Sequence, residues 1–217
     1  MKIITISREF GSGGRELGKR MADILGFDYY DREIITEIAK RQQMDEHYVE
    51  SVLDHRAWQM VPLTFHQSFA GSTLLQTAQT NLLLEQKKVL EGIAKLGHDC
   101  IIVGRNADIL LKDYQPLNLF VCADMEAKIR RCRERASQDE KLTDRQIEKG
   151  AHDIDRGRAR ARDMLTDCRW GNRTNYHLIV NTTDWSIKNL ASVIAEFCRQ
   201  YFAAKQPEAA AQVDANQ

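Results

Sequence analysis

A glycine-rich loop between a strand pattern and a helix pattern constrains this chain more than any other feature of its sequence. The β-branched run at residues 3–6 predicts a strand, and helical spacing of apolar residues begins at Leu17. Between them lie Gly11, Gly13 and Gly14. Glycine reaches positive φ without strain, so successive backbone N–H groups can converge on one anion, and the first helical turn adds its own unpaired N–H groups. This segment therefore predicts a cradle for phosphate.

The loop departs from the P-loop pattern at the positions that carry its chemistry. The pattern G-x-x-x-x-G-K-[ST] requires glycine, lysine and a hydroxyl where this chain has Arg8, Gly14 and Arg15. The dinucleotide pattern G-x-G-x-x-G fits no better, because Glu16 stands where its third glycine belongs. The length of the loop favours a mononucleotide cradle. An ordinary strand-to-helix connection is the alternative.

Length, charge and cysteine usage limit the function classes. With 217 residues the chain can build one substantial core. Its net charge of zero gives no general attraction to nucleic acid or to an anionic membrane, so we expect neither as a partner. No apolar run approaches ~20 residues, and no signal-peptide pattern opens the chain. The five cysteines include no C-x-x-C pair and the histidines form no ligand motif, so we expect reduced thiols, a cytoplasmic location and no metal site.

Strand and helix patterns alternate along the chain. The predicted strands lie at residues 3–6, 27–30, 99–103, 117–122 and 177–181. Helical patterns separate them and follow the last, the longest at residues 71–96. This alternation predicts an α/β fold in which helices cover both faces of a parallel sheet, giving three layers.

Basic and polar residues follow several of these strands. Arg8 leads into the glycine loop, Asp31 and Arg32 follow the second strand, and Gly104 and Arg105 follow the third. The carboxyl ends of parallel strands share one edge of the sheet, where ligands of such folds bind. Because the planar guanidinium suits phosphate oxygens, this edge predicts a site for a polyphosphate.

Five short segments contain most of these residues and extend over nearly the whole chain. They are I-T-I-S-R-E-F-G-S-G-G-R-E-L at 4–17, F-D-Y-Y-D-R at 27–32, V-G-R at 103–105, D-R-G-R at 155–158 and W-G-N-R-T-N-Y-H-L-I-V-N-T at 170–182. In sequence and order they resemble the cytidylate kinase-like family, a branch of the P-loop nucleoside monophosphate kinases. The resemblance implies a P-loop NTPase-like fold with an arginine-rich helical lid. It also implies transfer of the ATP γ-phosphate to a nucleoside monophosphate such as CMP, with Mg²⁺ carried by the nucleotide.

The resemblance implies three groups of site residues. The donor phosphates would be held by Gly11, Ser12, Gly13, Gly14 and Arg15. The acceptor would be bound by Asp31, Arg32 and Arg105. Catalytic cations in place of the missing lysine would be Arg8, Arg15 and Arg158, with Arg158 arriving only when a lid at about 142–173 closes. For each arginine, a solvated surface position is the alternative.

The domain organisation follows from the same comparison. We expect one kinase-like domain at residues 1–203, with an acceptor-side insert at about 29–97. Residues 44–69 are mixed in pattern and predict no definite element. Residues 204–217 are rich in alanine and glutamine with little apolar content, so we expect a disordered tail.

Other functions remain open on the sequence. The scaffold also suits a kinase for another small acceptor, and the missing lysine allows a catalytically weak nucleotide-binding sensor or interaction protein. An oxidoreductase ranks lower, although Asp31 lies about where a ribose-binding acid belongs. The wide apolar stripe of residues 71–96 suits packing on the core or, alternatively, a homodimer surface.

Overall fold

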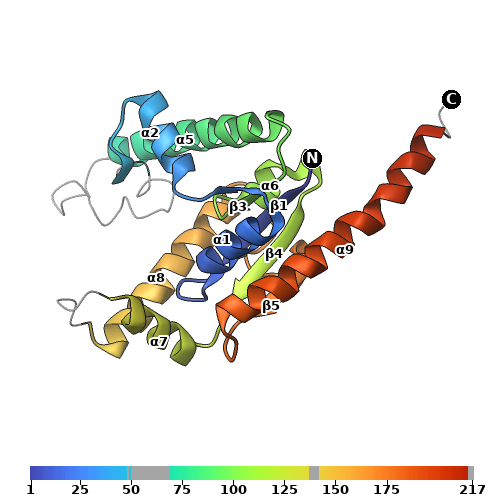
Figure 1. The fold of residues 1–217 in the computed structure, drawn as a ribbon. Coiled ribbons are helices and arrows are strands. Elements are labelled where there is room, and N and C mark those ends of the chain that lie inside the picture. The colour runs from blue at the N-terminus through green and yellow to red at the C-terminus, as the bar shows by residue number, and fades with distance from the viewer. Residues whose placement is uncertain (48, 50–68, 137–141, 215–217) are drawn as a thin grey trace.

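A five-stranded parallel sheet forms the centre of the fold (Figure 1). The computed structural model of the chain describes residues 1–47, 49, 69–136 and 142–214. The strands are β1 (Ile3–Arg8), β2 (Asp28–Tyr30), β3 (Cys100–Val103), β4 (Leu117–Cys122) and β5 (Leu178–Asn181). They lie in the order β2-β3-β1-β4-β5, and every neighbouring pair is parallel. The predicted parallel sheet is confirmed.

Helices cover both faces of this sheet, which confirms the three-layer prediction. One face is covered by α1 (Gly14–Leu25) and α9 (Ile187–Asp214), and the other by α2 (Glu33–Gln42), α5 (Phe69–Lys95) and α6 (Ala107–Leu110). Alternate strand residues supply the two cores, because successive side chains of a strand point to opposite faces. On β1, Ile4 and Ile6 pack with α1 and α9, whereas Ile3 packs with α2 and α5.

The arginine-rich part of the chain forms two helices after β4. They are α7 (Met125–Arg135) and α8 (Asp144–Asp163), and short 3₁₀ turns lie at Lys112–Tyr114 and Arg173–Asn175. Asp124 caps α7 by accepting a hydrogen bond from the Ala127 N–H at 2.8 Å. Thr143 and Gln146 form a capping box at the start of α8. These caps fix where both helices begin.

The long predicted helix exists as α5 and contributes to the core. Leu82, Leu83 and Leu90 are buried in the cluster on the α2 side of the sheet, whereas Leu84 is exposed. Among the side chains of α5 that the structure describes, from residue 80 on, part of the apolar stripe therefore packs on the core. A homodimer through residues 71–96 stays a prediction.

The C-terminal segment differs from the prediction. We expected disorder from residue 204, but α9 continues to Asp214, because alanine, glutamine and glutamate are good helix formers. Most of the stretch 44–69, from residue 50 to 68, lies outside the described residues, as do residues 215–217. Within the part of the chain that the structure describes, no helix has both the length and the apolar character that a membrane span requires.

Candidate functional site

The glycine loop packs tightly over the end of β1. Gly11 and Gly13 have φ of 73° and 81°, and α1 begins at Gly14. A Cβ at Gly14 would lie 2.6 Å from the Arg8 Cβ, so only glycine allows this approach. The buried Ser12 hydroxyl donates to the Glu9 carbonyl at 2.8 Å rather than facing the cleft. The loop is therefore a closely packed backbone structure, and its binding of phosphate stays a prediction.

Thr182, the residue after β5, fastens the far side of the loop. Its hydroxyl donates to the Ser12 carbonyl at 2.7 Å, and it accepts from an Arg131 Nη at 3.1 Å. Both Thr182 and Arg131 are buried. Residues from three distant parts of the chain thus hold one loop conformation.

The glycine loop contains no lysine of its own, but a lysine from another helix lies beside it. Lys128 of α7 is buried, and a Cβ at Gly11 would lie 3.0 Å from the Lys128 Cβ. Its Nζ lies 2.8 Å from Glu9 Oε2 and 4.0 Å from Asp155 Oδ2. Sequence reasoning missed this residue, because a lysine on a charged helix is typical of a solvated face.

Asp155 connects α8 to the same loop. Its Oδ1 accepts from the Phe10 N–H at 2.7 Å and from Arg158 Nη1 at 2.9 Å. Burial raises the pKa of the Asp155 carboxyl, and the charge of Arg158 opposes that rise. Two carboxylates, Glu9 and Asp155, therefore face two cations, Lys128 and Arg158, beside the loop.

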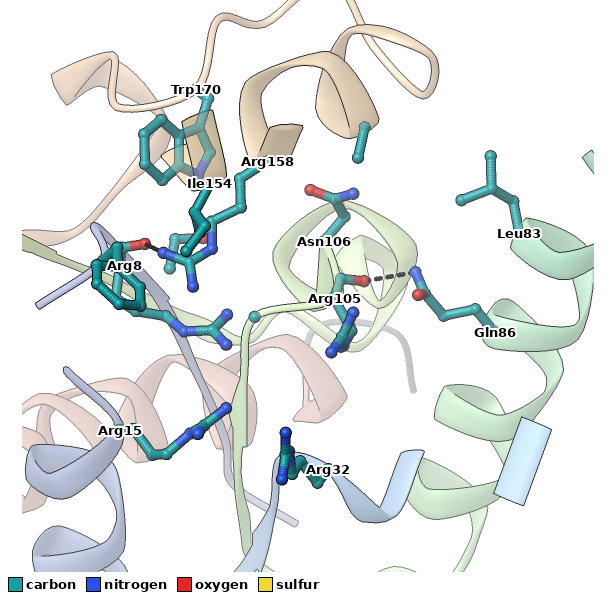
Figure 2. A pocket seen from close by; sticks show the side chains of 14 residues that line it. Arg8, Arg15, Arg32, Leu83, Gln86, Arg105, Asn106, Ile154, Arg158 and Trp170 are labelled. Atoms are coloured by element: carbon teal, nitrogen blue, oxygen red, sulfur yellow. Dashed lines mark hydrogen bonds between the residues drawn. The ribbon is translucent and has the colours of Figure 1, made fainter. Parts of the chain in front are cut away.

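A pocket of about 250 Å³ opens at the carboxyl edge of the sheet (Figure 2). Its lining comes from β1, the loop, α1, the N-cap of α2, α5, the β3–α6 turn, α8 and the segment after α8. The lining residues are Ser7, Arg8, Phe10, Arg15, Arg32, Leu83, Gln86, Gly104, Arg105, Asn106, Ile154, Arg158, Ala161 and Trp170. Five of them are arginines and none is an aspartate or glutamate. Such a lining favours an anion that bears several negative charges.

Arg8 is the buried member of this arginine group. Burial lowers its pKa to about 9, helped by the neighbouring charge of Arg158 and opposed by that of Asp31. Its Nη2 lies 3.6 Å from Asp31 Oδ1. A Cβ at Gly104 would lie 1.6 Å from Arg8 Nη1, so glycine at 104 makes room for this guanidinium. Because burial removes the water that would otherwise solvate its charge, the Arg8 guanidinium is suited to bind an anion.

Arg15 lines the pocket from the first turn of α1. We expected it among the donor-phosphate residues, whereas its guanidinium pairs with the buried Asp31 after β2. Asp31 thereby holds both Arg8 and Arg15. Both contacts are compatible with a role in orienting these arginines, and the predicted role of Asp31 in binding the acceptor stays a prediction.

Arg158 lies in the pocket without any closure of α8. Its Nη1 donates to the Arg8 carbonyl at 2.9 Å. One turn further along α8, Arg162 Nη1 lies 2.6 Å from Asp108 Oδ2, with only 3% of either side chain exposed. Arg162 also lies over the Tyr176 ring. Arg158 thus already lines the pocket in this structure, and this buried ion pair holds the end of α8. Its arrival on lid closure stays a prediction.

The remaining lining residues divide into predicted and missed ones. Arg32 and Arg105, which the sequence assigns to the acceptor, both line the pocket, and their binding of an acceptor stays a prediction. Gln86, Asn106 and Trp170 line it too and were missed. The W-G-N-R segment already contained a signal for Trp170, whereas an isolated glutamine in a long helix offers none. Of the donor-loop glycines, none lines this pocket, although Gly11 borders a neighbouring cavity between α7 and α8.

No group of three or more histidine, cysteine, aspartate or glutamate side chains in the described ranges is arranged to hold a metal ion. The pocket lining instead combines five guanidinium groups with two aromatic side chains, Phe10 and Trp170. Chemically, it can bind and orient phosphate groups and balance negative charge that develops on them.

Comparisons with known proteins agree with this geometry. A search of curated protein sequences finds no match. Among solved structures, an uncharacterized protein from Eubacterium ventriosum has a TM-score of 0.67 at 20% identity, over 92% of this chain and 99% of that chain. A shikimate kinase from Bacteroides thetaiotaomicron has a TM-score of 0.52 at 16% identity, over 91% and 98%. Protein TT1252 from Thermus thermophilus has a TM-score of 0.51 at 16% identity, over 90% and 97%.

At these identities the solved structures share the fold with this chain. The family comparison goes further, because a protein-family profile matches residues 3–184. The match spans the glycine loop, all five strands and every arginine of the pocket. The chain belongs to the cytidylate kinase-like family.

Proposed function

We propose that this protein is an ATP-dependent phosphotransferase that transfers the γ-phosphate of ATP to a nucleoside monophosphate such as CMP. Family membership supports a kinase. The observation that carries the proposal is the pocket of five arginines without a carboxylate in its lining. An acceptor phosphate and a transferring phosphoryl group together bring several negative charges, which such a lining matches.

The residues divide between the two substrates in this proposal. Arg32 and Arg105 hold the acceptor phosphate, and the backbone N–H groups at Gly11 to Gly14 hold the donor phosphates. Arg8 and Arg158 balance charge on the transferring group, since phosphoryl transfer depends on positioning and electrostatics more than on a nucleophilic side chain. Mg²⁺ bound to the nucleotide would be held largely by phosphates and water.

The decisive experiment supplies ATP, Mg²⁺ and a panel of nucleoside monophosphates to the purified full-length chain and follows ADP release. We expect turnover with a pyrimidine monophosphate such as CMP above the rate with ATP alone. Thermal unfolding in millimolar ATP should shift to higher temperature by mass action. Arg158→Ala should abolish most turnover, whereas Arg160→Ala, on an exposed position of the same helix, should leave it intact.

Two outcomes would contradict the proposal in different ways. Turnover of another small acceptor but of no nucleoside monophosphate would keep the kinase and replace the acceptor. Nucleotide binding without turnover of any acceptor would indicate a nucleotide-binding sensor instead.

A further inference from the structure

The turn after β3 has a left-handed backbone over three consecutive residues. Gly104, Arg105 and Asn106 have φ of 76°, 58° and 50°. For residues with a side chain this region is sparsely populated, and each such residue costs free energy. The turn therefore keeps this conformation only if contacts with the surrounding structure stabilise it. Its two side chains, Arg105 and Asn106, both line the arginine pocket (Figure 2).

One side chain from a distant helix holds this turn. Gln86 of α5 donates from Nε2 to the Arg105 carbonyl at 2.7 Å (Figure 2). Gln86 is 2% exposed, and its neighbours Leu82, Leu83 and Leu90 fix α5 on the core. Within the turn itself, the Ala107 N–H donates to the Gly104 carbonyl at 3.2 Å. The orientation of Arg105 thus depends on a hydrogen bond from α5, a helix that packs on the core and belongs to another part of the chain.

The chemistry of this contact suits an amide better than the alternatives. The Arg105 carbonyl needs a donor, and a carboxylate at 86 has none when ionised. A lysine would supply a donor but would add a charge beside the arginines that already line the pocket. Methionine matches glutamine in size and leaves the carbonyl without this hydrogen bond, at a typical net cost of about 1 kcal/mol.

We propose that Gln86 is a positioning residue that fixes the left-handed turn and thereby presents Arg105 to a phosphate group in the pocket. It acts through Arg105 and does not itself bind the phosphate. The proposal deepens the proposed function and rests on it for the identity of the acceptor. Its test uses inorganic pyrophosphate as the probe, so that it does not depend on turnover.

The experiment is isothermal titration of the full-length protein with pyrophosphate. Arg105→Ala should weaken binding about tenfold or more, and Gln86→Met about fivefold. The double variant should bind no more weakly than Arg105→Ala alone, since Gln86 acts through that arginine. Lys87→Met, a change at the exposed neighbouring position of α5, serves as the control and should bind like the wild type.

A rescue separates positioning from a general structural effect. Asn106→Gly removes the cost of the left-handed conformation at 106, because glycine adopts positive φ freely. In that background, Gln86→Met should cost less affinity than it does in the wild type. If Gln86→Met does not fold, Gln86→Asn replaces it, since its amide is one methylene too short to reach the carbonyl.

The outcomes test the role of Gln86 and the proposed function separately. Wild-type affinity in Gln86→Met, additive losses in the double variant, or no pyrophosphate binding by the wild type would each overturn the role of Gln86. Coupled losses together with no turnover of any nucleoside monophosphate would leave the role of Gln86 in place and overturn the proposed function.

Discussion

The glycine loop and the arginine pocket lie at the same edge of one sheet, yet they differ in how their charges are balanced. Beside the loop, Lys128 contacts Glu9 and Asp155, so its charge is met within the protein. In the pocket, five arginines share a lining that contains no acidic side chain. Two carboxylates outside the lining contact three of them: Asp31 engages Arg8 and Arg15, and Asp155 engages Arg158.

This difference suggests that the charges beside the loop stabilise the fold, whereas those in the pocket bind a ligand. A buried ion pair with both partners present holds a loop in place but offers little attraction to a further anion. An excess of guanidinium groups favours the binding of a further anion. Burial lowers the pKa of Arg8, and the neighbouring charge of Arg158 adds to this effect. Substitutions in the two regions should therefore change different quantities, namely fold stability beside the loop and ligand affinity or turnover in the pocket.

The largest effect is expected beside the loop. Lys128→Met should lower the free energy of unfolding by about 3 kcal/mol, because Glu9 and Asp155 keep their charges without this partner. Urea unfolding measures the loss. Pyrophosphate affinity should change by less than about twofold, which is below ~0.5 kcal/mol.

A paired substitution is the control for this prediction. Lys128→Met combined with Glu9→Gln removes both members of the shorter ion pair and should regain much of the lost stability. If the Lys128→Met variant were stable but bound pyrophosphate much more weakly, Lys128 would belong to the binding surface. The proposed difference between the two regions would then be wrong.

The next effect concerns turnover. Arg158→Ala should lower kcat by ~10²-fold, the scale of a lost electrostatic donor, with only a modest loss of ATP affinity. Steady-state kinetics with CMP and a separate ATP titration distinguish the two quantities. Loss of ATP affinity at unchanged kcat would show that Arg158 binds the ground state, as a donor-loop residue would.

A smaller effect is expected for acceptor binding. Arg105→Ala should raise the KM for CMP about tenfold or more, about 1.4 kcal/mol, because a guanidinium that faces the acceptor phosphate is lost. The KM for ATP should stay close to that of the wild type. A change confined to the KM for ATP would move Arg105 to the donor side.

The smallest effect is a pH dependence beside the loop. Burial raises the pKa of Asp155, so between the unfolded value of about 3.9 and the raised native value the native protein binds more protons than the unfolded chain. The stabilising contribution of this group is present below that window and is lost as pH rises through the native pKa. Relative to Asp155→Asn, the wild type should therefore lose stability as pH rises from about 4. Parallel stability curves would show that Asp155 is not the titrating group.

Local patterns in the sequence predicted much of the fold and part of the site. The alternation of apolar residues defined the strands, and the parallel arrangement then required Arg8, Asp31 and Arg105 to meet at one edge. Asp124 caps its helix because a capping residue acts within one turn. Such features depend on neighbours in sequence or on the general geometry of an open parallel sheet.

The features that the sequence did not reveal depend on particular distant partners. Lys128 is buried because Glu9 and Asp155 converge on it from β1's end and α8. Gln86 matters because the β3–α6 turn presents a carbonyl to it from 19 positions away. The guanidinium of Arg15 pairs with Asp31, which follows β2. None of these pairings follows from periodicity or motif spacing.

The buried contact of Arg162 with Asp108 has a consequence for the thermodynamics and kinetics of ligand exchange. Since α8 is held at this end and also at Asp155, its backbone entropy is already lost when the chain folds. Ligand binding then does not lose that entropy a second time. Amide hydrogens along α8 should exchange slowly in the free protein and change little on nucleotide addition. Entry to the pocket would then depend on the motions of side chains rather than on the opening of a helix.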